Sequence, residues 1–314
     1  MHSRCCLVDG DKRANWYNTS RDIHRPRGEV NLAMNRRFQL VDVFNDGPFS
    51  GNPLGVVFDA DDLDSESMQR ITRWLNLSET TFVLSPTTDK ADYRVRIFTL
   101  DREMPFAGHP TLGSCHAWLT AGGKPRNDSA IIQECGAGLV PIRRSSTTTL
   151  AFAAPPLIRS GPVEEAKLVE IAQALKIERS QIVDAQWADN GPGWIVLLLE
   201  SAQAVLDLEP VREHPTRLDV GIVGPYPVGT QPAFELRALF SDQHGGLRED
   251  PVTGSLNAST AQWLFASGRA TGNYTASQGT RLGRSGRIYI ERDADGTVWV
   301  GGKTTTLFAG ESTI

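Results

Sequence analysis

The sequence is poor in the features that mark membrane-spanning, secreted and metal-binding proteins. No apolar run approaches the about 18 residues needed to cross a bilayer, and the charged N-terminal segment lacks the apolar core of a signal peptide. The 314 residues include only four cysteines, none of them in a C-x-x-C pair. Neither a zinc site nor a disulfide framework is therefore indicated. We expect a cytoplasmic protein without a membrane partner or a bound metal.

Positive charge is also in deficit. The 32 Lys and Arg residues are outnumbered by 37 Asp and Glu residues, which gives a net charge of -5. No global basic field attracts nucleic acid, so we expect no nucleic-acid partner, and any anion site has to be local. A hydrophobic content of 40% is that of a folded globular protein, and the length suggests two domains of about 130 to 150 residues each.

The hydrophobic pattern predicts strands and one clear helix in the first part of the chain. Residues 1–33 are rich in charge and have no period, so we expect a disordered N-terminal extension. Alternation at 38–44 and the apolar run at 54–58 predict two strands. Asp64 is a candidate N-cap and Asn76 a candidate stop for a helix. Its expected apolar positions are Met68, Ile71, Trp74 and Leu75.

An internal repeat organises the rest of the chain. Pro-Phe-Ala-Gly at 105–108 precedes a Trp-Leu pair at 118–119, and Pro-Val-Thr-Gly at 251–254 precedes a Trp-Leu pair at 263–264. The copies lie about 145 residues apart, and Gln133 downstream of the first matches Gln278 downstream of the second. Strand, glycine turn and helix therefore recur in the same order.

The repeat predicts two similar domains. The first is expected over residues 34–154, with a C-terminal strand at about 302–314 returning to it, and the second over 155–301. Pro-Pro at 155–156 marks the crossover. Small residues after each glycine turn let a helix lie against a closely curved sheet.

Each glycine turn stands directly before a predicted helix, at Gly108 and at Gly254. Two helix N-termini, with free N–H groups and positive dipole ends, could then bind a carboxylate in a cleft between the domains. Alternatively, the glycines only permit tight turns.

Three polar residues near these turns are candidates for chemistry. Glu79 lies between a helix end and an apolar strand, where desolvation would raise its pKa into a range useful for proton transfer. His109 follows Gly108 and could donate a hydrogen bond or carry a proton. Asp250 precedes the second turn and could orient a substrate. The alternatives are a solvated junction residue for Glu79, a capping or buried histidine, and a turn-initiating aspartate.

Three segments together resemble the PhzF family of phenazine-biosynthesis isomerases. They are Asn-Leu-Ser-Glu-Thr-Thr-Phe-Val at 76–83, Pro-Phe-Ala-Gly-His-Pro-Thr-Leu-Gly at 105–113 and Glu-Asp-Pro-Val-Thr-Gly-Ser at 249–255. The resemblance covers roughly residues 34–314. It implies an α+β, diaminopimelate-epimerase-like fold, with two similar domains, each a curved, mostly antiparallel sheet around a central helix, and an active site in the cleft between them.

The resemblance also implies roles for single residues. Glu79 takes the position of the glutamate that moves a proton within dihydro-3-hydroxyanthranilate, while His109, Asp250 and Ser255 take positions that assist proton transfer or bind substrate. Backbone N–H groups after Gly108 and Gly254 would hold the carboxylate. No cofactor is implied, and a homodimer is expected. Leu256 departs from the small residue usual in the family, so we expect it to reshape the pocket.

The leading hypothesis is thus a cofactor-independent isomerase acting on a small acidic substrate. An epimerase or racemase of amino or hydroxy acids is a second hypothesis, but it needs two opposed acid/base groups, and Cys115 and Cys135 lie outside both glycine turns. A third hypothesis is a non-catalytic small-molecule-binding protein of the same fold.

Overall fold

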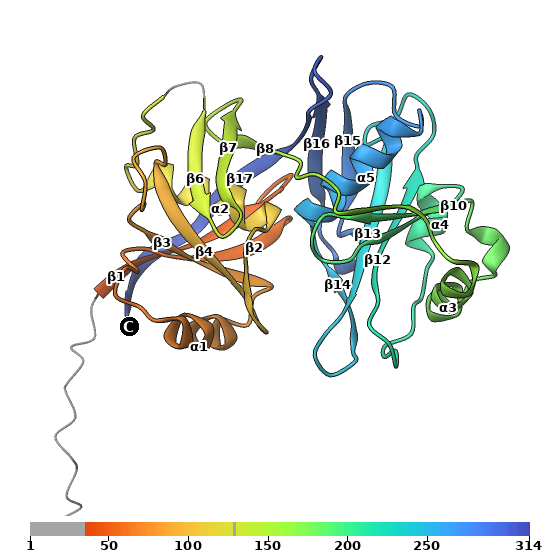
Figure 1. Ribbon diagram of the computed structural model, residues 1–314, viewed down its shortest axis with the longest axis horizontal. Helices are drawn as coiled ribbons and strands as arrows, with labels where there is room; N and C mark the ends of the chain where they lie inside the picture. The colour runs from red at the N-terminus through yellow and green to blue at the C-terminus, as the bar shows by residue number, and fades with distance from the viewer. Residues whose placement is uncertain (1–34, 128–129) are drawn as a thin grey trace, which may run out of the picture. The chain divides into compact units, whose positions relative to one another are not determined.

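The computed structural model describes residues 35–127 and 130–314 (Figure 1). The predicted N-terminal extension, residues 1–33, lies outside them. The helices are α1 (Ser65–Leu75), α2 (Gly108–Thr120), α3 (Glu165–Leu175), α4 (Ala202–Leu206) and α5 (Gly254–Ala266), with short 3₁₀ turns at Arg179–Gln181 and Thr280–Leu282. The strands of the first half are β1 (Asn35–Val43), β2 (Asn52–Val57), β3 (Glu79–Leu84), β4 (Tyr93–Thr99), β5 (Glu103–Met104), β6 (Ile131–Cys135), β7 (Gly138–Arg144) and β8 (Thr149–Ala153). Those of the second half are β9 (Arg159–Pro162), β10 (Asp184–Asp189), β11 (Ile195–Leu198), β12 (Asp219–Pro225), β13 (Phe234–Ser241), β14 (Leu247–Asp250), β15 (Tyr274–Gln278), β16 (Gly286–Arg292) and β17 (Val298–Thr313).

The described strands form one mixed, hydrogen-bonded sheet system. Most pairings are antiparallel, but β2 pairs with β3 and β4 with β6 in parallel. The second half repeats this pattern, because β11 pairs with β12 and β13 with β15 in parallel. The repeat seen in the sequence therefore recurs in the strand pairing.

The long strand β17 connects the two sets of strands. Its beginning pairs with β16 and with β8, and from Thr304 onward it pairs with β1. Figure 1 shows this blue strand leaving the side of β16 and ending beside β1. The end of the chain thus pairs with the first strand, while the division into two domains stays a prediction.

The two repeat helices are buried among strands. Helix α2 contacts β1, β2, β3, β4, β6, β8 and β17, and α5 contacts β10, β12 and β17. Ten of the thirteen residues in each helix are buried, including Ser114 and Ser259. Because small residues surround these positions, strands can approach the helix closely from several sides.

Helix α1 begins and ends where the sequence predicts. The Asp64 side chain accepts a hydrogen bond from Ser67 N, and Asn76 ends the helix in the left-handed conformation. Met68 is fully buried, but Trp74 is 84% exposed, so its assignment to the apolar face was wrong. None of the described helices is long and apolar enough to cross a membrane.

The structure corrects the interpretation of Leu256. Its side chain is fully buried, and a Cβ added to Gly221 of β12 would lie 2.2 Å from Leu256 Cδ1. Leu256 therefore packs α5 onto β12 through a position that only glycine leaves open. It stabilises the core and does not line a pocket.

Candidate active site

The two glycine turns meet each other. A Cβ added to Gly108 would lie 2.9 Å from the Cα of Gly254 and 2.6 Å from Phe152 Cζ, and a Cβ on Gly254 would lie 3.1 Å from His109 N. Since these distances are far below van der Waals contact, glycine is required at both turns. Neither N-cap residue, Ala107 or Thr253, caps its helix with a side-chain hydrogen bond. First-turn N–H groups of both helices are thus concentrated in one place.

Glu79 and His109 lie against each other beside this junction. Glu79 begins β3, as the sequence predicts, and its Oε2 is 3.6 Å from Nε2 of His109 in the first turn of α2. That separation is too long for a hydrogen bond. Both atoms are buried and have no hydrogen-bond partner. The Glu79 side chain as a whole keeps 18% of its surface exposed, although its Oε2 atom is buried.

The environment of this pair shifts both pKa values. Burial, and to a smaller extent the Asp250 carboxylate, raises the pKa of Glu79 well above its ordinary value. Burial lowers the pKa of His109 to about 3, so the imidazole is neutral at physiological pH. The pair is therefore not an ion pair, despite its short separation. It consists of a carboxyl group able to exchange a proton and a neutral imidazole.

Asp250 completes the group but is held much more firmly. Its Oδ1 accepts hydrogen bonds from Ser78 Oγ at 3.2 Å and Asn52 Nδ2 at 3.1 Å, and its Oδ2 accepts one from Thr253 Oγ1 at 2.6 Å. Burial raises the pKa of Asp250 to about 6, although these hydrogen bonds oppose the shift. Asp250 is thus mostly ionised at neutral pH and fixed in orientation, and its charge favours the protonated form of Glu79.

Asn52 and Gln278 are site residues that sequence reasoning missed. The buried Asn52 amide contacts both His109 and Asp250. Gln278 donates to the carbonyl oxygen of Asp250 at 3.1 Å and to Thr253 Oγ1 at 3.0 Å. The only available signals were the Asn-Pro pair after the first strand and the repeat match between the two glutamines.

Ser255 lies at the second turn but contacts a different pair of side chains. Its hydroxyl accepts a hydrogen bond from Trp194 Nε1 at 3.1 Å, and its carbonyl accepts one from Asn190 Nδ2 at 2.8 Å. The Asn190 Oδ1 atom is buried without a partner. Since the Trp194 indole occupies an acceptor position of the Ser255 hydroxyl, the hydroxyl proton is left to donate elsewhere.

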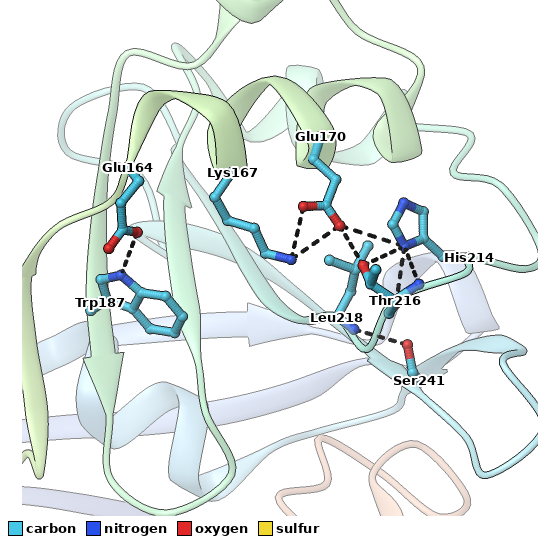
Figure 2. Close-up of polar contacts among 8 residues, drawn as sticks. All are labelled: Glu164, Lys167, Glu170, Trp187, His214, Thr216, Leu218 and Ser241. Atoms are coloured by element: carbon cyan, nitrogen blue, oxygen red, sulfur yellow. Dashed lines mark hydrogen bonds and ion pairs between the residues drawn. The ribbon is translucent and has the colours of Figure 1, made fainter.

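A second histidine and glutamate pair shows what a structural pair looks like. Glu170 Oε1 of α3 is 3.9 Å from His214 Nδ1, but Lys167 Nζ donates to both Glu170 oxygens at 3.1 Å. The Thr216 hydroxyl also donates to Glu170, as Figure 2 shows. These contacts lower the pKa of Glu170. It is therefore an ionised, fully bonded carboxylate, unlike Glu79.

Other features do not compete with this location. A surface cavity of about 340 Å³, lined among others by Arg37, Asp59 and Trp118, includes none of the candidate site residues. Across residues 35–127 and 130–314, no three His, Cys, Asp or Glu side chains are arranged to hold a metal ion. The unpartnered carboxyl and imidazole groups beside the two helix N-termini are therefore the best candidate for a catalytic centre.

Fold and comparisons define the class of protein. Solved structures of PhzF-family proteins and of a hydroxyproline epimerase share this fold, so the chain has the mixed sheet of the diaminopimelate-epimerase-like proteins. A predicted epimerase from Pseudomonas aeruginosa is similar at a TM-score of 0.72 and 27% identity, covering 89% of this chain and 99% of the other. The class is therefore defined by fold, and two of the neighbours that share this fold are named as epimerases.

Sequence relatives narrow the class to one family. The family described as phenazine biosynthesis-like protein, PhzC-PhzF, matches residues 41–310. The chain is 32% identical to trans-2,3-dihydro-3-hydroxyanthranilate isomerase of Pseudomonas aeruginosa, over 83% of this chain and 91% of that protein. It is 37% identical to "Antisense-enhancing sequence 1" of Schizosaccharomyces pombe, over 88% and 98%. The chain belongs to the PhzF family and is an enzyme of the isomerase class.

Proposed function

We propose that this isomerase needs no cofactor and moves a proton within a small carboxylate-bearing substrate, similar to trans-2,3-dihydro-3-hydroxyanthranilate. The observation that carries the proposal is the unpartnered Glu79–His109 pair beside two uncapped helix N-termini. A buried substrate carboxylate would accept hydrogen bonds from N–H groups of the first turns, after Gly108 and Gly254, and the Ser255 hydroxyl would donate a further one.

In the proposed reaction, Glu79 acts as general base and then as general acid. Its carboxylate takes a proton from one substrate carbon, and the electron pair left behind delocalises through the adjacent double bonds. The protonated Glu79 then returns the proton to another carbon, so that no net charge or atom is gained or lost. A raised pKa suits both steps, because it brings the pKa of the Glu79 carboxyl closer to that of the substrate carbon with which it exchanges the proton. Asp250 orients the surrounding groups.

An epimerase or racemase is the second candidate. It would need a second acid/base group on the opposite face of the substrate, and the nearest carboxylate, Asp250, is already held by three hydrogen-bond donors. A non-catalytic binding role, the third hypothesis from the sequence, is disfavoured because the relatives are named isomerases. It would leave the raised pKa of Glu79 without a use.

The finer architecture and assembly are proposed along with the function. We place the domains at 34–154, with the strand at about 302–314, and at 155–301, each built around its own repeat helix, α2 or α5. The strand β17 would then connect the two domains. A homodimer in the cytoplasm, with a small acidic substrate as its ligand and no nucleic acid, completes the proposal.

The deciding experiment replaces Glu79. The purified native chain is incubated with trans-2,3-dihydro-3-hydroxyanthranilate in heavy water, and we expect isomerisation with deuterium at a product carbon, because Glu79 is partly exposed. Glu79→Gln keeps the shape of the side chain but cannot accept the proton, so turnover should fall by about 10² to 10⁴-fold.

The matched control is Glu103→Gln. Glu103 is an exposed carboxylate bonded to Arg96, away from the pair, so its loss should leave turnover unchanged. If Glu79→Gln keeps turnover within about tenfold of native with an unchanged circular dichroism spectrum, Glu79 is not the base. Inversion at one carbon without movement of a double bond would instead support the epimerase.

A further inference from the structure

Asn52 makes an unusual set of contacts at the first residue of β2. Its side chain is fully buried, and its amide nitrogen lies 2.9 Å from the carbonyl oxygen of Val252, 3.1 Å from Asp250 Oδ1 and 3.4 Å from His109 Nδ1. One amide group therefore touches both glycine-turn segments. Val252 and Asp250 are 200 and 198 residues away in the sequence.

These neighbours fix which way the amide faces. The Val252 carbonyl can only accept a hydrogen bond, and Asp250 Oδ1 already accepts one from Ser78. If the amide of Asn52 were turned over, its oxygen would face two acceptor oxygens at about 3 Å without a proton between them. The two protons of the Asn52 NH₂ group must therefore point at the Val252 and Asp250 oxygens, and the same nitrogen lies 3.4 Å from His109 Nδ1.

This orientation decides where the imidazole carries its proton. A neutral imidazole has one N–H and one bare nitrogen, and His109 is neutral because burial lowers its pKa to about 3. A proton on Nδ1 would point at the NH₂ group of Asn52, donor against donor. The bare nitrogen is therefore Nδ1, and the proton lies on Nε2, 3.6 Å from Glu79 Oε2.

We propose that Asn52 is a positioning residue that holds the His109 imidazole with its proton on Nε2, directed toward Glu79. His109 then serves as a fixed hydrogen-bond donor, able to stabilise negative charge on a substrate. Proton transfer is left to Glu79 alone. The catalytic consequence rests on the proposed function, whereas the position of the proton does not.

The backbone before Asn52 is built to hold it. Asp42 of β1 accepts hydrogen bonds from Ser50 N at 3.0 Å and Gly51 N at 2.8 Å. A Cβ on Gly51 would lie 2.7 Å from Asp42 Oδ1 and 2.1 Å from the carbonyl oxygen of Val43, so only glycine fits there. The strand pairing then sets Asn52 opposite Val43. Position and direction of the amide are thus both fixed before any substrate binds.

The test reads the proton of His109 directly. In protein labelled with ¹⁵N at its six histidines, a long-range ¹H–¹⁵N correlation spectrum separates the nitrogen that bears the proton from the bare one. The His109 signals are assigned from the signals missing in His109→Gln. We expect the native protein to carry the proton on Nε2. A native imidazole protonated on Nδ1, or on both nitrogens at pH 7, overturns the proposal.

Substitutions then test whether Asn52 is the cause. Asn52→Leu removes the donor, so His109 should become a mixture of both tautomers, and Asn52→Asp presents an acceptor, so the proton should move to Nδ1. The control is Ser241→Ala, because Ser241 of β13 is a buried polar residue whose hydroxyl accepts from Leu218 N, away from Asn52 and the imidazole. It should lower stability and leave the tautomer as it is. An unchanged Nε2 proton in either folded Asn52 variant overturns the proposal, and the native spectrum tests the tautomer without any variant.

A kinetic measurement separates this role from a structural one. If the tautomer matters, Asn52→Leu should lower kcat by roughly 10² to 10⁴-fold, the range in which acid/base groups and correct tautomers act, while KM changes much less. If kcat stays native although the tautomer has changed, His109 does not act as the donor and the catalytic part of the proposal fails. Failure of every variant and of the native chain on the tested substrate, with the tautomer as expected, would count against the proposed function alone.

Discussion

The two glycine turns have the same backbone plan but opposite polar chemistry. Both place a glycine in direct contact with the other turn, and both begin a thirteen-residue buried helix. Beside the first turn, the facing atoms of Glu79 and His109 have no hydrogen-bond partner. Beside the second, the Asp250 carboxylate is bonded on both oxygens.

This difference shows how a duplicated scaffold can be divided into a reactive and a supporting part. Leaving buried polar groups unpaired costs stability, so it is tolerated where a ligand will pair them. The Asp250 carboxylate of the second turn, bonded on both oxygens, supplies a rigid, charged support for the first. Reactive groups are therefore concentrated on one side of the junction, which fits transfer of a proton on a single face of the substrate.

The largest effect is expected from the packing of the second turn. Leu256→Ala should destabilise the protein by about 2 to 5 kcal/mol, because the side chain is fully buried against Gly221 and leaves a cavity. Urea unfolding measures the change. Leu282→Ala, at a position 41% exposed, is the control and should change stability by about 0.5 kcal/mol or less. A selective change of substrate preference with native stability would restore the idea that Leu256 lines the pocket.

The pH dependence of stability should run in opposite directions at the two turns. The pKa of His109 is lowered to about 3, so its contribution is present above pH 6.5 and is lost as the pH falls. The pKa of Asp250 is raised from 3.8 to about 6, so its contribution is present at low pH and is lost as the pH rises toward 6. The contribution of each group to the free energy of unfolding should change by about 2 to 3 kcal/mol between pH 7.5 and 4.5.

Unfolding of native protein, His109→Gln and Asp250→Asn at both pH values measures these contributions. On acidification, the stability of native protein relative to His109→Gln should decrease, and its stability relative to Asp250→Asn should increase. Asp250→Asn also removes the negative charge that raises the pKa of Glu79. This loss enlarges the stability difference between native protein and Asp250→Asn on acidification. Two differences of the same sign would show that the turns are not chemically opposed.

Much of the scaffold could be predicted because its signals are local. Asp64 and Asn76 mark the ends of α1, and the two strands predicted at 38–44 and 54–58 fall largely on β1 and β2. Such patterns are readable because capping and period-2 alternation depend on residues that are near in sequence. The internal repeat also allowed a prediction about segments far apart in the sequence, since it matched the two segments that form the helices α2 and α5.

The residues whose roles were missed or wrongly predicted have roles that are set by contacts between segments far apart in the sequence. Asn52 lies 198 positions before Asp250 and meets it only in the folded chain, and no local pattern marks an asparagine that donates to a distant carboxylate. Leu256 was assigned to the pocket because it replaces a small family residue beside the second turn, yet its side chain packs into the core. Trp74 fits the helical period but lies at the exposed edge of its stripe.

The smallest effect should come from the two glutamines that the repeat aligns. Both are fully buried. Gln133 donates to Thr111 Oγ1 and accepts from the Tyr93 hydroxyl, at 3.0 Å each. Gln278 has four bonds, because its Oε1 also accepts from Thr253 N and Asn257 Nδ2.

Gln133→Leu and Gln278→Leu should each lower the free energy of unfolding by about 1 to 3 kcal/mol, with the larger loss at Gln278, because that variant strands a backbone N–H and a side-chain amide. Only Gln278 bonds to the peptide oxygen of Asp250 and to its hydroxyl partner Thr253, so only Gln278→Leu should also reduce turnover and move the acidic limb of the pH–rate profile. Urea unfolding and kcat/KM between pH 5 and 8 measure both effects. If Gln133→Leu altered the pH profile as much as Gln278→Leu, the two turns would contribute equally to the chemistry, and the division into a reactive and a supporting turn would have to be abandoned.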